Sequence, residues 1–245
     1  MTSRSENILL GESVTGVAHL RQRRQNQDAV KVRSHGYGCV AAVADGVGSQ
    51  RYSEYGSRAA VRAVHEVFCA YVRGDVRRGW ITQTIASWYA EMVKPAFRSE
   101  AATTCLFAAH IYAEGLFLGQ AGDGICCGFL NGVPFSLGKE RDTFSNLVVP
   151  LSAGGGKTID WRTRFIPQKK LREIELMLAT DGVSEDLLPG KESAFVRYLL
   201  TQVAAREVEE QRKKLRQVLE QWETPLAQDD RTISLYRHAA GTGGL

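Results

Sequence analysis

The sequence predicts an α+β fold in which neighbouring strands pair antiparallel. Strand-like segments follow one another with short links between residues 104 and 130, and a two-residue hairpin signal, Asn131-Gly132, comes next. Segments with a helical period of apolar residues lie at 55–72, 80–94 and 192–222. This order of strands, helices and strands again lacks the regular strand–helix alternation that builds a parallel sheet.

The first half of the chain contains three predicted strands and two predicted helices. The strands are expected at 14–20, 29–33 and 38–44. The helix at 55–72 is expected to begin from Ser53 as its N-cap. Its apolar face consists of Ala60, Val64, Val67, Phe68 and Tyr71. The helix at 80–94 is expected to end at Pro95, because proline does not continue a helix.

The second half is richer in predicted strands. They are expected at 104–112, 115–121, 125–130, 144–150, 161–166 and 173–180, with a last strand at 231–237. The segment 192–222 is predicted as helix, in one or two pieces. Residues 1–12 and 238–245 are predicted as flexible ends, which leaves one domain over 13–237.

Composition excludes several classes of protein. The 245-residue chain has a net charge of +4, which is too mild to argue for nucleic acid as a partner. No run of apolar residues is long enough for a transmembrane helix, and the N-terminus lacks a secretory signal. The five cysteines form no Cys-x-x-Cys pair and the five histidines are scattered, so free thiols in the cytoplasm are predicted rather than a zinc site.

Acidic residues border four strand-like segments. They are Asp45-Gly46, Asp123-Gly124, Asp181-Gly182 and Asp229-Asp230. One Asp-Gly pair is usually only a turn. Several carboxylates at one rim of a sandwich would repel each other unless a cation neutralised them, and oxygen ligands suit Mg²⁺ or Mn²⁺. The set therefore predicts a metal site.

These segments make the chain resemble the metal-dependent protein phosphatases, the type 2C serine/threonine phosphatases. The matching pieces, in the family's order, are RRQNQDAV (23–30), VADGVGS (43–49), AATTCLF (101–107), GQAGDGICCGF (119–129), LATDGVSED (178–186) and QDDRTISL (228–235). The resemblance implies two packed antiparallel β-sheets flanked by α-helices. It also implies a site for two Mn²⁺ or Mg²⁺ ions at one end of the sandwich.

The resemblance assigns the core site residue by residue. Asp45 would bridge both ions, and the carbonyl of Gly46 would bind one of them. Asp181 and Asp229 would bind the other ion, although the neighbouring Asp230 leaves the choice within that pair open. Asp28 would hold a metal-bound water. Asp45, Asp181 and Asp28 are thus the implied catalytic residues.

Outer positions of the site follow in the same way. Asp123 would bind a third, weaker ion with Glu185 as a partner, and Arg23 would bind the substrate phosphate. Val47 stands where many members have histidine, and Glu185 stands where aspartate is common, so the proton donor and the third ion are open questions.

The segment SAGGGKT (152–158) ends like a nucleotide-binding loop but has Leu151 in place of its first glycine, so a surface loop is the preferred interpretation.

The resemblance implies metal-dependent hydrolysis of phosphoserine and phosphothreonine in proteins by a compact bacterial-type enzyme of cytoplasmic signalling. A phosphoprotein would be the substrate and a Ser/Thr kinase the opposing enzyme, with no nucleic acid or membrane partner. The alternative is an inactive regulatory module that binds phosphoproteins on the same fold. A nucleotide-hydrolysing switch that depends on Lys157 is a more distant possibility.

Overall fold

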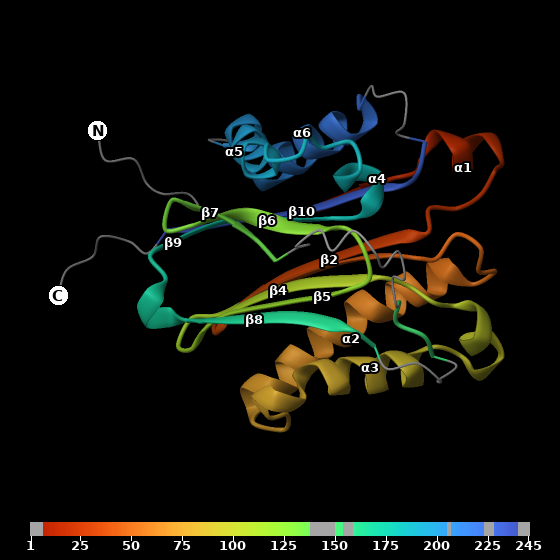
Figure 1. Ribbon diagram of the computed structural model, residues 1–245, viewed down its shortest axis with the longest axis horizontal. Helices are drawn as coiled ribbons and strands as arrows, with labels where there is room; N and C mark the ends of the chain where they lie inside the picture. Colours follow the sequence, from red (N-terminus) through yellow and green to blue (C-terminus); the bar gives the residue numbers. More distant parts are fainter. Residues whose placement is uncertain (1–6, 138–149, 154–158, 205–206, 223–227, 240–245) are drawn as a thin grey trace.

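Two antiparallel five-stranded sheets pack face to face, and a helical layer covers the outer face of each (Figure 1). The structure is a computed structural model that describes residues 7–137, 150–153, 159–204, 207–222 and 228–239. Sheet I has the order β1 (Ile8–Val14), β10 (Arg231–Ala239), β9 (Glu173–Ala179), β6 (Ile125–Leu130), β7 (Val133–Ser136). Sheet II has the order β2 (Asp28–His35), β3 (Gly38–Asp45), β4 (Cys105–Ile111), β5 (Gly115–Ala121), β8 (Trp161–Pro167).

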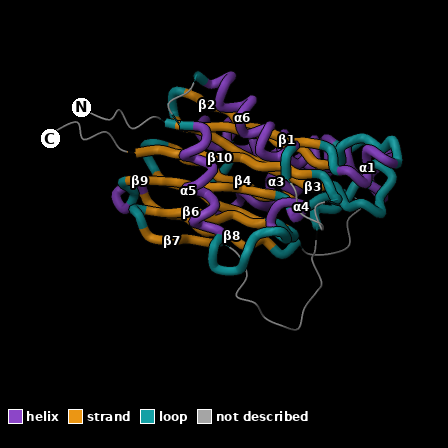
Figure 2. Tube along the Cα trace, turned by 90° about the horizontal axis from the view of Figure 1, so that it is seen from above, coloured by secondary structure: helices purple, strands orange, loops and turns teal. Residues whose placement is uncertain are grey.

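Two pairs of helices form the outer layers. The long helix α2 (Ser53–Arg73) and α3 (Ile81–Met92) cover sheet II, whereas α5 (Glu192–Val203) and α6 (Val208–Glu220) cover sheet I (Figures 1 and 2). Two short helices, α1 (Val17–Arg21) and α4 (Asp181–Ser184), lie at one end of the sandwich. Single 3₁₀ turns occur at Arg78–Trp80, Pro95–Glu100 and Gln168–Lys170. No helix in the described residues combines the length and the apolar character required to span a bilayer.

The central strands are apolar on both faces because both faces are buried. In β3, Val40, Ala42 and Ala44 pack toward α2 and α3. The alternate residues Cys39, Ala41 and Val43 pack between the two sheets. This arrangement explains the unbroken apolar run that ends at Asp45, because a strand with both faces buried does not alternate between apolar and polar residues.

Most predicted elements are confirmed. The helical segment 192–222 is indeed two helices, and the strands at 29–33, 38–44, 104–112, 115–121, 125–130, 161–166, 173–180 and 231–237 are present within a few residues. The predicted strand at 144–150 lies outside the described residues except for Pro150. The glycine-rich stretch 152–158, with Lys157, lies outside them from residue 154 onward.

The prediction for the N-terminal segment is wrong. The strand expected at 14–20 occurs earlier, at Ile8–Val14, and Val17–Arg21 is helical. Residues 8–12 are therefore part of the sandwich rather than a flexible end. Gly11 interrupts the apolar pattern from which this strand could have been predicted. The packing leaves no room for a side chain at this position, because a Cβ at Gly11 would lie 2.6 Å from Cγ2 of Val30 in the facing sheet.

Two smaller predictions also need correction. Ser53 is the first residue of α2 rather than its N-cap, and its buried hydroxyl makes no capping hydrogen bond within the described residues. At the other end of the chain, β10 continues through His238 to Ala239, so these two residues belong to sheet I and not to a flexible tail.

Candidate active site

The predicted acidic residues come from strand ends of both sheets. Asp45 is the last residue of β3, and Asp123 lies in the turn through which the chain passes from β5 in sheet II to β6 in sheet I. Asp181 follows β9 as the first residue of α4, and Asp229 precedes β10. Because adjacent strands are antiparallel, these ends all meet at the same end of the sandwich.

Three of these carboxylates converge on one point. Asp45, Asp123 and Asp181 can each place one oxygen so that all three atoms lie within 4.8 Å of one another. They line a cavity of about 300 Å³, which Asp229, Gly46 and His19 also line. No lysine or arginine is among the described residues that line this cavity. The carboxylates thus face each other without a basic side chain between them.

The backbone of Asp45 is held by the two threonines that precede β4. Its amide donates to Oγ1 of Thr104 at 3.1 Å, and its carbonyl accepts from the amide of Thr104 at 2.7 Å and from Oγ1 of Thr103 at 2.6 Å. Both threonines are buried. This bonding fixes the place where the strand ends and leaves the carboxylate of Asp45 to face the cavity.

The glycines that follow the acids are required by close packing. A Cβ on Gly46 would lie 2.6 Å from the carbonyl carbon of Ser53 at the start of α2. A Cβ on Gly182 would lie 2.0 Å from the carbonyl oxygen of Asp230. These contacts bring α2 against the end of β3, and the Asp229-Asp230 segment against the start of α4.

Asp28 lies behind Asp45, as its register partner in the β2–β3 pair. It is buried, and its Oδ2 accepts a hydrogen bond from Oγ1 of Thr180 at 2.8 Å. The hydroxyl of Thr180 in turn accepts from the amide of Thr232 at 3.2 Å. Asp28 is not a lining residue of the cavity, so it can orient Asp45 but stands one layer behind it.

Burial and mutual repulsion raise the pKa values of the clustered acids. The pKa of Asp45 is raised well above its usual range, first by burial and then by Asp28 and Asp181. Burial raises the pKa of Asp28 to about 7, and burial with the charges of Asp123 and Asp229 raises the pKa of Asp181 to about 6. Such shifts are expected where carboxylates are brought together without a compensating cation.

The structure separates Asp229 from Asp230. Asp230 is 2% exposed, and its oxygens accept from the amide of Gly16 at 2.7 Å and from the amide of Gln27 at 2.6 Å. Its Oδ2 also lies 2.9 Å from Nδ1 of His19. Asp229 is exposed and lines the cavity instead. Asp230 therefore fastens the α1 segment, and Asp229 is the acid that faces Asp45 and Asp181.

The remaining predicted residues lie outside the cavity wall. Glu185 is exposed one turn after Asp181, where it acts on that carboxylate only through its charge. Arg23 is exposed in the turn after α1, with a φ of 55°. Arg24, in contrast, lines a second cavity of about 460 Å³ that shares Gln27 and Gly48 with the acidic one.

Sequence reasoning missed His19, Gln27, Thr104 and Thr180. His19 and Gln27 line the acidic cavity and are tied to Asp230, whereas the two threonines hold Asp45 and Asp28 in place. Gln27, Thr104 and Thr180 each lie inside a segment that matches the family pattern, whereas His19 lies outside those segments and carried no signal.

The oxygen donors present suit a hard divalent cation. Clustered carboxylates that have raised pKa values and no lysine or arginine beside them in the cavity offer the oxygen ligands that Mg²⁺ and Mn²⁺ prefer in proteins. The clustered aspartates are therefore suitable ligands for Mg²⁺ or Mn²⁺. The same cavity offers no thiol, so a soft metal would find no preferred ligand among its described lining residues.

Comparison with solved structures supports the fold. PppA from Pseudomonas aeruginosa, described as a key regulatory component of T6SS, has a TM-score of 0.63 at 15% identity, over 96% of this chain and 99% of that chain. MsPP, a PPM Ser-Thr phosphatase from Mycobacterium smegmatis, gives 0.61 at 17% identity over 94% and 97%. RsbX, solved in complex with magnesium, gives 0.56 at 13% identity over 95% and 99%.

Sequence comparison assigns the family. The chain has no significant match among curated protein sequences. Residues 15–220, which include most of both sheets and the clustered Asp45, Asp123 and Asp181, match the family described as Protein phosphatase 2C. Since this match extends over most of the chain and the sandwich agrees with it, the chain belongs to the protein phosphatase 2C family.

Proposed function

We propose that the protein hydrolyses phosphoserine and phosphothreonine in proteins at a metal centre held by its clustered aspartates. The observation that carries the proposal is the convergence of Asp45, Asp123 and Asp181, with Asp229 beside them, in a cavity whose described lining has no lysine or arginine. Family membership supports the reaction class, and the oxygen-only donor set supports Mn²⁺ or Mg²⁺. We place the whole catalytic unit within residues 8–239.

Each acid has a proposed part in holding the ions. Asp45 and the carbonyl of Gly46 would bind at the end of β3, and Asp181 and Asp229 would complete the core pair from sheet I. Asp123 would bind a third ion, with Glu185 as its exposed neighbour. When bound, divalent cations lower the pKa of water, orient it for in-line attack on phosphorus and offset charge on the phosphate oxygens.

Other residues would position these groups and the substrate. Asp28, fixed by Thr180, would hold Asp45 in place and orient water through its remaining oxygen. Arg23 would bind the phosphate with paired donors, which suits a guanidinium. Water adds to phosphorus as the ester P–O bond breaks, and the serine or threonine oxygen leaves as the alcohol after taking up a proton.

The free cysteines and the similar solved structures support a signalling role in the cytoplasm. All five cysteines are free thiols, as expected for a reducing compartment. The similar PppA is described as a key regulatory component, which supports a regulatory phosphoprotein as substrate, and the similar RsbX was solved in complex with magnesium, which supports Mg²⁺ as cofactor. We further infer a Ser/Thr kinase as the opposing enzyme. We expect no nucleic acid partner.

A phosphopeptide assay across a metal series tests the proposal. We expect phosphate release from phosphoserine and phosphothreonine peptides with Mn²⁺ or Mg²⁺, and none in EDTA. Activity that survives EDTA would contradict the metal mechanism. A folded protein that binds Mn²⁺ and phosphopeptide without turnover would support the regulatory-module alternative, and ATP turnover lost on changing Lys157 would point to a nucleotide switch.

A further inference from the structure

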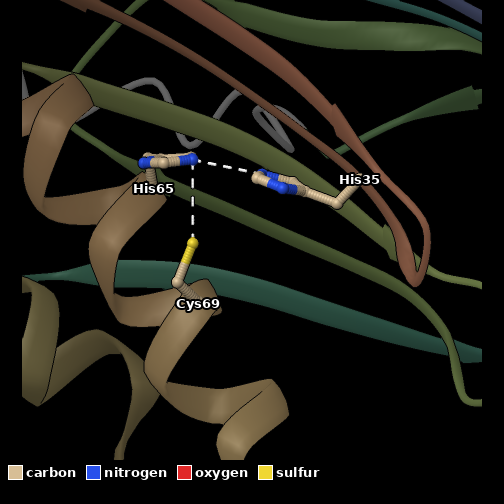
Figure 3. A group of neighbouring side chains, drawn as sticks. All are labelled: His35, His65 and Cys69. Atoms are coloured by element: carbon tan, nitrogen blue, oxygen red, sulfur yellow. Dashed lines mark hydrogen bonds between the residues drawn. The ribbon is translucent and has the colours of Figure 1, made fainter.

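A second group of potential metal ligands lies far from the acidic cavity. His35 is the last residue of β2, and His65 and Cys69 stand one helical turn apart on α2. Figure 3 shows the three side chains pointing toward one another, with His65 between the other two. Each can offer one ligand atom within 4.8 Å of the others.

The spacing of these atoms suits a tetrahedral zinc ion. Nε2 of His35 lies 3.1 Å from Nε2 of His65, and Sγ of Cys69 lies 3.7 Å from the same nitrogen. Bond lengths of about 2.0 Å for Zn–N and about 2.3 Å for Zn–S at tetrahedral angles require separations of about 3.3 Å between the nitrogens and about 3.5 Å between nitrogen and sulfur. Small side-chain rotations are therefore enough to place all three atoms around one ion.

The second ring nitrogen of His65 has the surroundings of a metal-ligating imidazole. Its Nδ1 is buried and makes no hydrogen bond within the described part of the chain, while Oε1 of Glu66 lies 3.5 Å away. A carboxylate near the non-ligating nitrogen commonly fixes the ring of a zinc-bound histidine. Hydrogen bonds join Nε2 of His65 both to Nε2 of His35 and to Sγ of Cys69, so all three potential ligand atoms already converge without a metal ion.

The charge and access of the cluster also suit a cation. Burial and the charge of Lys31 lower the pKa of His65, while Glu66 acts in the opposite direction, so the ring is favoured in the neutral form that binds a metal; the thiolate of Cys69 would supply a negative charge. Tyr37 stacks on His35 at 4.7 Å between ring centroids, and its hydroxyl lies 3.4 Å from Sγ of Cys69, which restrains both ligands. All three ligand residues are half-buried, so an ion and a water as fourth ligand can reach them.

We propose that His35, His65 and Cys69 form a Zn²⁺ site that is separate from the acidic cluster and fastens the end of β2 to α2. Both elements start near the acids: β2 at Asp28, and α2 at Ser53 beside Gly46. Eight strand residues and roughly three helical turns put the new site about 20 Å from the acids. The nitrogen and sulfur ligands select a softer ion than the carboxylates do. The proposal goes beyond phosphate hydrolysis and does not depend on it.

Cobalt substitution in the full chain tests the site directly. The metal-stripped, reduced protein is given excess Mg²⁺ to fill the acidic cluster and then one equivalent of Co²⁺. We expect the absorption bands of tetrahedral Co²⁺ with a thiolate-to-cobalt charge-transfer band, and their loss when one equivalent of Zn²⁺ is added. Cys69→Ser should remove the charge-transfer band, and His35→Ala should weaken Co²⁺ binding at least tenfold.

Two matched variants locate the signal. Asp45→Asn should keep the cobalt bands, and Cys69→Ser should keep Mn²⁺-dependent phosphatase turnover, so that the two sites fail independently. Zn²⁺ should raise the melting temperature of the wild-type chain but not that of Cys69→Ser. The site is refuted if folded wild-type protein shows no charge-transfer band, or if the band persists in folded Cys69→Ser.

Discussion

Asp229 and Asp230 are neighbours in the sequence but have different surroundings. Their hydrogen bonds determine which of the two carboxylates can bind a cation. Asp230 is enclosed by two backbone amides and His19, so its oxygens are already used in holding α1 against β10. Asp229 is one residue away but exposed to the cavity. Asp229 accepts only the adjacent amide of Asp230, through Oδ1 at 2.8 Å, whereas both oxygens of Asp230 are engaged, so Asp229 is the carboxylate that remains available to a cation.

This contrast predicts opposite results for two asparagine variants. Asp230→Asn places an amide NH₂ against a backbone N–H, so it should lower the free energy of unfolding by about 1–3 kcal/mol. Asp229→Asn should change stability by less than about 0.5 kcal/mol in EDTA, since the side chain is exposed. It should nevertheless weaken Mn²⁺ binding. Urea unfolding in EDTA and calorimetric Mn²⁺ titration measure both quantities, and a reversed pattern would assign the ligand to Asp230.

The neighbouring arginines Arg23 and Arg24 provide a second test at the residue scale. The family resemblance selects Arg23 for the phosphate, while the structure puts Arg24 in the wall of the adjoining cavity. Charge-assisted hydrogen bonds contribute about 1.5–3 kcal/mol, so Arg23→Ala should raise KM for a phosphopeptide about tenfold or more with little change in Mn²⁺ affinity. Steady-state kinetics of both alanine variants show which arginine binds the phosphate. A larger effect of Arg24→Ala would move the phosphate contact to Arg24.

At the scale of elements, the sequence predicts those strands and helices whose apolar pattern is set by the core. β3 and the second half of β9, from Leu176 to Ala179, are evident as unbroken apolar runs because both faces of these strands are covered. The first strand escapes detection because Gly11 and Glu12 interrupt its pattern. Both residues are explained by contacts with segments that are distant in the sequence. Gly11 packs against Val30 of the facing sheet, and Glu12 forms an ion pair with Arg212 of α6 at 2.7 Å.

The acidic site follows from the sequence to the extent that its residues mark strand ends. Asp45, Asp123 and Asp181 each stand before a glycine at the end of an apolar run, and antiparallel pairing brings those ends together. The cluster of His35, His65 and Cys69 could not be found by ligand spacing along the chain, because the fold brings β2 against α2. Its only local trace is the i, i+4 spacing of His65 and Cys69 on one helix face.

At the scale of the whole molecule, the raised pKa values predict how stability changes with pH. Without bound cations, Asp28, Asp181 and Asp45 hold protons in the folded state that they lose near pH 4 when unfolded. At these acids the folded chain binds more protons, so their contribution to stability should fall as pH rises from about 4 through 7, whereas His65, His110 and His238, whose pKa values burial lowers, contribute in the opposite direction. The slope is about 1.4 kcal/mol per pH unit for each proton by which the two states differ.

Thermal melts in EDTA between pH 5 and pH 8 measure this slope. We expect the melting temperature to fall as pH rises, the fall to be smaller in Asp45→Asn, and saturating Mn²⁺ to abolish it because the ions neutralise the carboxylates. A melting temperature that rises over this range in EDTA, or an unchanged slope in Asp45→Asn, would show that the acids are not the source of the pH dependence.

The central claim is that the carboxylates at one end of the sandwich form the metal centre at which phosphate esters are hydrolysed. Mn²⁺ titration by calorimetry, combined with initial rates on a phosphoserine peptide, tests it in one pair of variants. Asp181→Asn should lose tight Mn²⁺ binding and slow turnover on the order of a thousandfold, whereas Asp123→Asn should keep the tightly bound ions and turn over more slowly than wild type. Tight Mn²⁺ binding and full turnover in Asp181→Asn would contradict the claim.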